Sequence, residues 1–254
     1  MKKSKIAAVC ATLAAGLMLG SCGIADTVTT VVTEIVQEAT TFAFDEMGGG
    51  DIVTLATSGI SDGEQLHVSL ANNAVSIRLH ADEMILVEFS PPTTGQYQVP
   101  TVEIAAGRVE ITEPLNVNFA ANTRPGMVYI YLPQTVVLDS MDLRAINGAI
   151  RIIGDFSRAA DSIEITATNG MIDIHYFAAS NISARTTNGT INASNLDTPT
   201  LALNTTNGVI TLRNSEVSGD LTARTVNGTV LLENVDADMG RADVNAVNGT
   251  VTIR

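Results

Sequence analysis

The chain has 254 residues, of which 45% are hydrophobic but only 4% aromatic, and it contains no tryptophan. This hydrophobic share excludes a disordered chain, and the shortage of large aromatic side chains argues against an ordinary α/β enzyme domain. All three lysines (Lys2, Lys3 and Lys5) lie at the start, and without them 11 arginines oppose 27 acidic residues, a net charge of −16. Such an acidic surface repels a phosphate backbone, so we expect no nucleic-acid partner.

The start of the chain has the features of a bacterial export signal. After the lysines, residues 6–19 form an apolar run that is shorter than the roughly 20 residues needed to span a bilayer. The sequence LGSC at 19–22 resembles a lipoprotein lipobox. The resemblance implies that residues 1–21 are a signal peptide and that Cys22 carries lipid, so we expect an exported protein anchored in the cell envelope. Gly23 at the second mature position is compatible with the outer membrane of a Gram-negative cell.

Residues 22–50 are expected to form a tether between the lipid and the domain. Apolar residues recur at steps of three and four between residues 26 and 47, which is the spacing of one helical face, and three glycines follow. The valines and threonines lower the helix propensity, so a flexible spacer is the alternative.

The second half of the chain, residues 136–254, contains an internal repeat. Counted from the asparagine of each Asn-Gly pair as position zero, positions −6, −4, −2, +3 and +5 are apolar or threonine. This alternation predicts a half-buried strand on each side of every pair. The pairs recur at intervals of 19–22 residues, at Asn147-Gly148, Asn169-Gly170, Asn188-Gly189, Asn207-Gly208, Asn227-Gly228 and Asn248-Gly249.

Two all-β architectures fit this repeat. Asn-Gly between alternating strands is typical of a tight hairpin, so an antiparallel β-meander is one candidate. The other is a parallel β-solenoid with coils of about 20 residues, in which Asn-Gly marks a recurring left-handed corner and stacked asparagine amides form a ladder. We favour the solenoid, because thin coils that stack only on their neighbours explain the small core residues and the missing tryptophan.

Residues 51–135 are expected to form a degenerate, more aromatic section that caps the solenoid. The segments LANNAVSI at 70–77 and IAAGRVEI at 104–111 resemble weaker copies of the repeat. MILVEF at 84–89 and VYIYL at 128–132 are typical of buried strands.

The segments VSLANNAVSIRL and VYIYLP, followed by serial A-x-x-NG-x-I-x-I units, resemble the bacterial β-repeat family of candidate adhesins. This family of unknown biochemical function is related to the head GIN domain proteins, and the resemblance covers residues 66–254. It implies a right-handed β-solenoid on the cell envelope. The family has no established catalytic residues, so none is transferred to this chain.

The sequence contains no motif that predicts catalysis, a metal or a cofactor. There is no HExxH and no paired-cysteine spacing. His67, His80 and His175 are interpreted as surface residues. A group of acids between residues 233 and 243 has the oxygen ligands that calcium prefers, but a solvated acidic loop is the simpler interpretation.

Position −3 of the repeat, on the outward side of the strand, carries an arginine in every second coil: Arg144, Arg185 and Arg224. These arginines form a candidate binding stripe for anionic groups of an envelope polymer. The alternation with Thr and Asn also avoids like-charge repulsion between stacked neighbours, which is the simpler interpretation.

We therefore expect a lipid-anchored envelope protein that uses its solenoid surface for adhesion, binding or scaffolding, without catalysis. The expected partners are the membrane, through the lipid, and envelope glycans or surface proteins. One alternative is a polysaccharide-active enzyme of the pectate-lyase type, which needs clustered acids for calcium and a basic residue. Another is a structural protein that self-associates through its C-terminal coil, because an uncovered strand edge can pair with another copy.

Overall fold

The computed structural model of the protein describes residues 48–93, 97–105, 107–113, 125–155, 158–238 and 241–254. The predicted signal peptide, the lipidation site Cys22 and nearly all of the predicted tether lie outside these ranges. The chain divides into two compact units, Met1–Glu46 and Met47–Arg254, and the description below concerns the second.

Every regular element among these residues is a β-strand, which confirms the all-β prediction. The strands are β1 (Val53–Gly59), β2 (Gln65–Leu70), β3 (Ala74–His80), β4 (Met84–Ser90), β5 (Thr101–Ala105), β6 (Arg108–Thr112), β7 (Met127–Pro133), β8 (Leu138–Ala145), β9 (Ile150–Ile153), β10 (Arg158–Ala167), β11 (Ile172–Asn188), β12 (Ile191–Ala237) and β13 (Asp243–Ile253). In this part of the chain no helix has the length and apolar character needed to cross a membrane.

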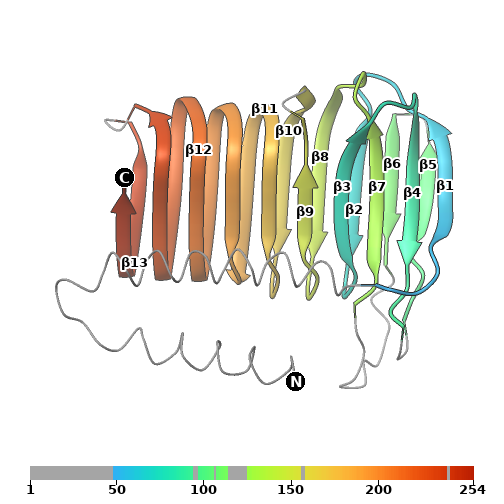
Figure 1. Cartoon of the computed structure of the whole chain (residues 1–254), viewed down its shortest axis with the longest axis horizontal. Helices are drawn as coiled ribbons and strands as arrows, with labels where there is room; N and C mark the ends of the chain where they lie inside the picture. The colour runs from blue at the N-terminus through green and yellow to red at the C-terminus, as the bar shows by residue number, and fades with distance from the viewer. Residues whose placement is uncertain (1–47, 94–96, 106, 114–124, 156–157, 239–240) are drawn as a thin grey trace. The chain divides into compact units, whose positions relative to one another are not determined.

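The repeats stack in parallel, as in a solenoid. Strand β10 pairs in parallel with β8 and β11, β11 with β12, and β12 with β13. Ile172 lies between Ile150 and Ile191, its counterparts in the neighbouring repeats. The alternative of an antiparallel hairpin meander is wrong, because in a meander the two strands that flank each Asn-Gly would pair with each other. The parallel rows are visible in Figure 1.

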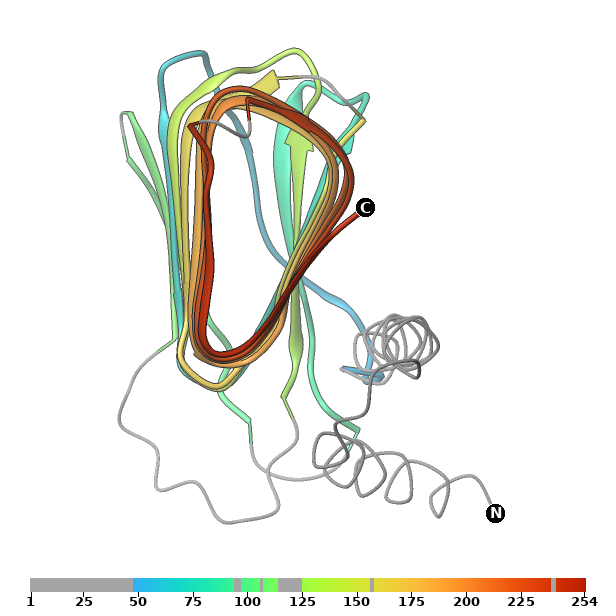
Figure 2. The same cartoon turned by 90° about the vertical axis from the view of Figure 1, so that its left-hand side faces the viewer.

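Each coil has two long sides and one short side when it is viewed along the stack (Figure 2). The strand before Asn-Gly forms the first long side, and the strand after Asn-Gly forms the second. Strand β12 runs through several corners as one continuous element of 47 residues, because hydrogen bonding to the adjacent coils continues around them. We call the outer surfaces of the two long sides the first and the second long face.

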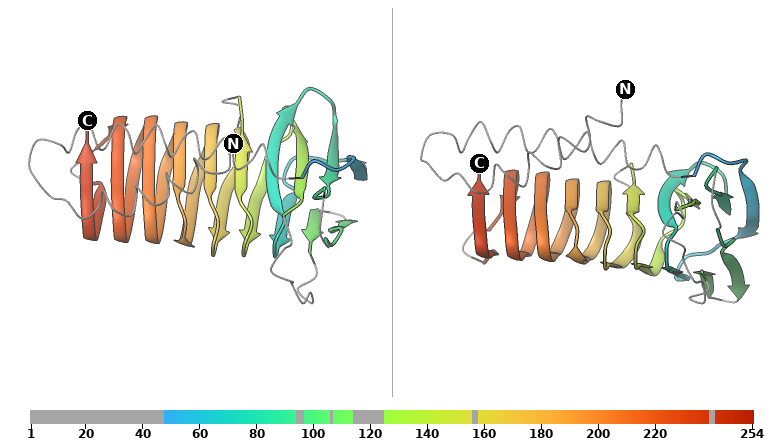
Figure 3. Two further views of the ribbon diagram at one scale, coloured as in Figure 1. Left: turned by 60° about the horizontal axis from the view of Figure 1, so that its bottom comes forward. Right: turned by 90° about the horizontal axis from the view of Figure 1, so that it is seen from below.

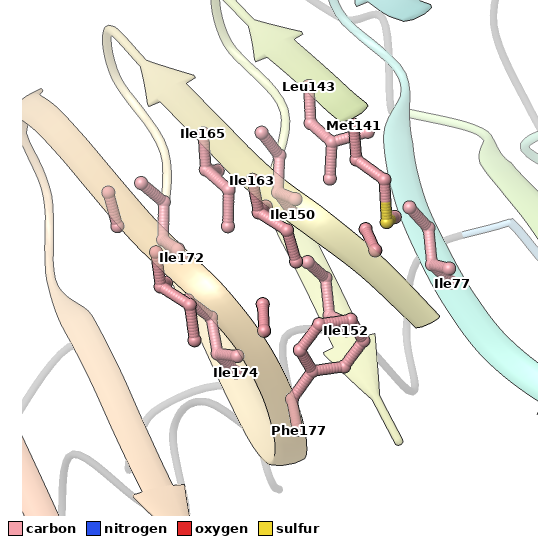
Figure 4. Close-up of a cluster of buried hydrophobic side chains, with 14 of the residues drawn as sticks. Ile77, Met141, Leu143, Ile150, Ile152, Ile163, Ile165, Ile172, Ile174 and Phe177 are labelled. Atoms are coloured by element: carbon pink, nitrogen blue, oxygen red, sulfur yellow. The ribbon is translucent and has the colours of Figure 1, made fainter. Parts of the chain in front are cut away.

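The interior is filled by layers of isoleucine, leucine, valine and alanine from the predicted inward positions. Ile163, Ile165, Ile172 and Ile174 are at most 1% exposed, and Figure 4 shows how such side chains from successive coils gather in one interior. Among the described residues only two buried core side chains are aromatic, Phe89 and Phe177. A narrow coil has little room for larger rings, which accounts for the composition of the chain.

The Asn-Gly corners are joined by a ladder of side-chain amides. In every coil the Nδ2 of the corner asparagine donates to the Oδ1 of the asparagine one coil earlier, over 2.8–3.0 Å. The ladder begins at Asn72, which takes the place of a repeat asparagine in the coil of β2 and β3. Residues 70–77 are thus a copy of the repeat, as the sequence indicates.

The corner glycines are required by close packing and not by a left-handed backbone. No asparagine or glycine of the six pairs has a positive φ, so the predicted left-handed corner at Asn-Gly is wrong. A Cβ added at Gly208 would instead collide with the carbonyl oxygen of Gly189, and the other corner glycines meet the preceding coil in the same way. Thr205, two residues before its Asn-Gly pair, is 5% exposed, and its hydroxyl donates to the Gly189 carbonyl over 3.3 Å.

A left-handed corner does exist, at position +7, where the second long side meets the short side. The residues at +7 in four successive coils are Tyr176, Asn195, Asn214 and Asn234, with φ between 47° and 55°. Asparagine tolerates this conformation better than most residues. The residues that follow Asn195 and Asn214 continue the coil as part of strand β12.

The N-terminal section adds both parallel and antiparallel strands, and its coils do not follow sequence order. Strand β2 lies between β6 and β8, and β3 lies between β7 and β9, all in parallel. Strands β4 and β1 continue the sheet beyond β7, and β5 beyond β6, in antiparallel pairing. Figure 3 shows these strands at one end of the stacked coils. The interpretation of residues 104–111 as a copy of the repeat is wrong, because β5 and β6 pair with each other across Gly107, at φ 82°.

A buried carboxylate ends the stack of corners on the N-terminal side. Glu113 is 5% exposed, and its Oε2 accepts hydrogen bonds from the backbone N–H groups of Ala71, Asn72 and Asn73 over 2.9–3.0 Å. In the next coil the corresponding N–H of Asn147 donates to the Ala71 carbonyl. Glu113 thus accepts from these N–H groups in the way that backbone carbonyls do at the corners of the later coils.

The substitution Gly208→Ala tests the close contact between corners. We expect it to lower the free energy of unfolding by about 3 kcal/mol, because the new methyl group forces two coils apart. Gly59→Ala is the matched control, since a Cβ there would meet nothing within 4 Å. Chemical denaturation measures both variants, and equal stability of the two would contradict the account.

Candidate functional site

The candidate binding stripe lies on the first long face. The residues at position −3 occupy one row across the sheet, since Thr166 lies between Arg144 and Arg185, and Arg224 lies beside Asn245. All three arginine side chains point to solvent. The stripe therefore exists as a row of outward side chains in successive coils.

Two of the three arginines in the stripe are paired with acids. The Nε of Arg144 donates to Asp142 over 2.9 Å, and this hydrogen bond raises the pKa of the guanidinium. Arg224 is bonded to Asp243 of the next coil. Arg185 has no ion pair with any other residue that the structure describes. The sequence did not predict these pairs, because they depend on acids at position −5, which belong to the same coil for Arg144 and to the next coil for Arg224.

The histidines are less exposed than the sequence analysis assumed. The side chains of His67, His80 and His175 are between 17% and 29% exposed. The ring of His67 hydrogen-bonds Asp142, and His80 hydrogen-bonds the Met84 carbonyl. Both rings join neighbouring segments of the fold.

His175 belongs to a polar cluster on the second long face. Its Nε2 lies 2.6 Å from Oδ1 of Asp173, and its Nδ1 lies 2.6 Å from Oγ of Ser194 in the next coil. Asp173 is 2% exposed, and its other oxygen accepts a hydrogen bond of 2.9 Å from Nε of Arg151 in the preceding coil. The Nδ2 of Asn195 donates to the Ser194 oxygen over 3.1 Å.

The sequence analysis did not find this cluster, because its members come from three coils. Asp173 and His175 are two residues apart on one strand, so both point outward. The parallel register places Ser194 beside His175, which lies 19 residues earlier in the chain. The signal that would have found it is the alignment of repeat positions +4 and +6, which places Arg151 beside Asp173 and His175 beside Ser194 in neighbouring coils.

Aromatic side chains gather on the same face in the N-terminal section. The rings of Tyr129 and Tyr131 stack with centroids 6.4 Å apart, and the guanidinium of Arg78 lies 6.0 Å from the Tyr129 ring. Burial, followed by the nearby Glu88, raises the pKa of Tyr131. These groups share the outer surface of β3, β4 and β7.

The acids considered for calcium do not converge on one site. Glu233 pairs with Arg213 on the second long face, and Asp243 with Arg224 on the first. Among the residues that the structure describes, no three His, Cys, Asp or Glu side chains are grouped so that they could hold a metal ion. A calcium-dependent lyase site of the kind considered above is therefore not assembled from them.

Several solved structures align with most of this chain. A candidate cell adhesion protein from Clostridium sporogenes is 12% identical, with a TM-score of 0.49 over 80% of this chain and 99% of its own. Candidate adhesins from Bacteroides fragilis and Parabacteroides distasonis are 10% and 16% identical, with TM-scores of 0.46 and 0.39. Each alignment covers 82% of this chain and 99% of the other. None of the curated proteins matches the chain.

A family model gives the relationship directly. The model of the Toastrack family DUF4097 matches residues 63–254, which include all of the coils and most of the N-terminal section. The match confirms the resemblance to the bacterial β-repeat family of candidate adhesins. On this match, the chain belongs to the Toastrack DUF4097 family.

Proposed function

We propose that the protein is a lipid-anchored protein of the bacterial cell envelope that binds extended partners through its first long face. The observation that carries this proposal is the repetition of outward positions −5, −3 and −1 in successive coils, in register. Neighbouring coils in such a stack are about 4.8 Å apart, so a repetitive partner meets the same kind of group again and again. Weak contacts summed along the first long face then give firm adhesion, and this face takes no part in catalysis.

The side chains of this face favour an envelope glycan or a surface protein as the partner. Position −3 offers arginine, threonine and asparagine, and position −1 offers Thr168, Thr187 and Thr206. These groups donate and accept hydrogen bonds, and Arg185 is a cation that suits a carboxylate or sulfate group. The acidic charge of the chain disfavours nucleic acid.

The same proposal includes a right-handed solenoid of about 20 residues per coil. Paired residues of neighbouring coils are 19 residues apart between β11 and β12 and 21 apart between β12 and β13. In Figure 2 the coil turns counterclockwise toward the viewer as the chain proceeds to its C-terminus, which supports the right-handed sense.

A second candidate role is assembly through β13. Val251 and Ile253 of β13 are 38% and 54% exposed, whereas Val230 and Leu232, which align with them one coil earlier, are fully buried. Core positions of the repeat are thus uncovered at this end of the stack. A further β-strand paired with β13 would bury these exposed apolar side chains.

The partner that we infer for β13 is the β13 of a second copy. The opposite end of the stack is covered by the antiparallel strands β1, β4 and β5 and by Glu113. Among the residues that the structure describes, this end therefore offers no free corner on which a C-terminal coil could continue. Two C-terminal ends that meet about a two-fold axis give a closed dimer.

The anchor is tested by Cys22→Ala. We expect the variant to move from the membrane fraction to the soluble fraction, because it lacks the residue that accepts the lipid. Cys10→Ala, in the predicted signal peptide, is the control and stays with the membranes. A Cys22→Ala protein that remained membrane-bound would contradict the anchor. Cell fractionation is the measurement.

The binding face is tested by the triple variant Arg144→Ala, Arg185→Ala, Arg224→Ala on an array of envelope glycans. We expect at least about a tenfold loss of apparent affinity, because contacts that act together are lost together. The control is Arg78→Ala with Arg213→Ala, which removes two arginines of the second long face. Equal binding by the triple variant and the wild type would exclude the stripe.

The dimer is tested by Val251→Glu with Ile253→Glu. We expect sedimentation to give a dimer for the wild type and a monomer for the variant, because buried carboxylates are costly without partners. Val226→Glu, at an exposed position of an inner coil, should remain dimeric. A wild type that is monomeric over the whole concentration range would contradict this role.

A further inference from the structure

We propose that a cluster on the second long face hydrolyses small carboxylic esters. Ser194 is the nucleophile, His175 is the general base, and Asp173 is the carboxylate that orients the base. This activity goes beyond the proposed binding function, which uses the other long face. The three residues are joined by two hydrogen bonds of 2.6 Å, one on each nitrogen of the imidazole. A serine needs such an arrangement, because its hydroxyl is a weak nucleophile until a base takes its proton.

The hydrogen bonds fix the direction in which the proton can move. The Asp173 carboxylate only accepts, so Nε2 of His175 carries a hydrogen and donates to it. In the neutral ring Nδ1 is then the acceptor, and the Ser194 hydroxyl donates to it. His175 is thus in the tautomer that a general base requires. In the serine proteases the Nε2 of the histidine faces the serine, whereas in this cluster the Nδ1 does.

Asp173 is held in place on both of its oxygens. Its side chain is 2% exposed, and Arg151 donates to one oxygen while His175 occupies the other. A carboxylate so fixed keeps the imidazole oriented and stabilises the imidazolium that forms when Ser194 loses its proton. Asp173 therefore acts as a positioning residue through His175.

Asn195 supplies a donor beside the nucleophile. Its Nδ2 lies 3.1 Å from the Ser194 oxygen, and its left-handed backbone, at φ 54°, directly follows Ser194 in the chain. An amide at this distance can donate to the oxygen of a substrate carbonyl once that carbon has been attacked. The corner that sequence reasoning missed thus places an oxyanion donor next to the serine.

The reaction has two balanced halves. Ser194 Oγ attacks the ester carbonyl, its proton passes to Nδ1 of His175, and a tetrahedral oxyanion forms that accepts from Nδ2 of Asn195. The bond to the alcohol oxygen then breaks, and the alcohol leaves with the proton from His175. Water attacks the acyl-serine in the same way, with His175 as base, and releases the carboxylic acid and free Ser194.

The position of the cluster indicates a small acyl group. The three residues lie on the outer surface of β11 and β12, and the His175 ring is 29% exposed, so the ester is reached from solvent. An outer sheet surface encloses little of a substrate, which suits acetyl-sized esters on a larger alcohol. The alcohol can belong to a small molecule or to an extended partner.

The test uses the full chain, a fluorophosphonate probe and p-nitrophenyl acetate. We expect the probe to label Ser194, identified by peptide mass spectrometry, and the protein to hydrolyse the ester. Ser194→Ala should abolish the labelling and reduce hydrolysis to background. His175→Asn should lower the rate about 100-fold, as expected for loss of a general base.

Two matched variants separate chemistry from folding. Asn195→Gly keeps the left-handed corner but removes the amide, so we expect a loss of about 100-fold in rate with unchanged thermal stability. Asn214→Gly makes the same change one coil later and should keep full activity. Ser183→Ala, an outward serine on the first long face, is the control for Ser194→Ala.

The result that would overturn the proposal is an absence of Ser194 labelling and of ester hydrolysis above the Ser194→Ala background. Hydrolysis that is unchanged in His175→Asn would overturn it equally. Glycan binding by Ser194→Ala should equal that of the wild type, so failure of the esterase and failure of the binding function are distinguishable.

Discussion

The fold depends on the contact between each corner glycine and the carbonyl of the coil before it. A side chain at this place would hold two coils apart, and the amide ladder of Asn72, Asn147 and their successors would then be stretched beyond hydrogen-bond distance. In three coils a buried threonine two residues before the corner bonds the same carbonyl, as Thr205 does to Gly189. Close backbone approach and the amide ladder thus act at one point of every coil, joined in three coils by a threonine hydroxyl, and the thin aliphatic interior follows from the register that they set.

The repeat could be predicted from the sequence because its features recur in every coil. Period-two alternation around Asn-Gly identifies the buried side chains, and identical residues in one row favour parallel stacking. The same sequence did not predict that β6 and β7 stack outside β2 and β3, since nothing in local patterning encodes the order of coils in space. It also assigned the left-handed backbone to the wrong corner, because both Asn-Gly and a lone Asn such as Asn214 tolerate that conformation.

The functional surfaces are harder to predict than the repeat, because their side-chain contacts do not recur in every coil. The arginines of the first long face were predicted because they recur, but their pairing with Asp142 and Asp243 depends on side-chain reach across the sheet. The Ser194, His175 and Asp173 cluster was not predicted, because each of its residues departs from the repeat and they meet only through the parallel register. In a solenoid, recurrence identifies the scaffold, and the departures from recurrence identify candidate chemistry.

The stacking itself is tested most directly by removing one coil. Deletion of residues 189–207 joins Asn188 to Gly208 and leaves every remaining corner with a neighbour. The account predicts that the shortened protein unfolds cooperatively and that the distance between spin labels at residues 140 and 222, measured by pulsed electron paramagnetic resonance, falls by about 4.8 Å, one coil spacing. An unchanged distance, or a protein that no longer folds, would contradict it.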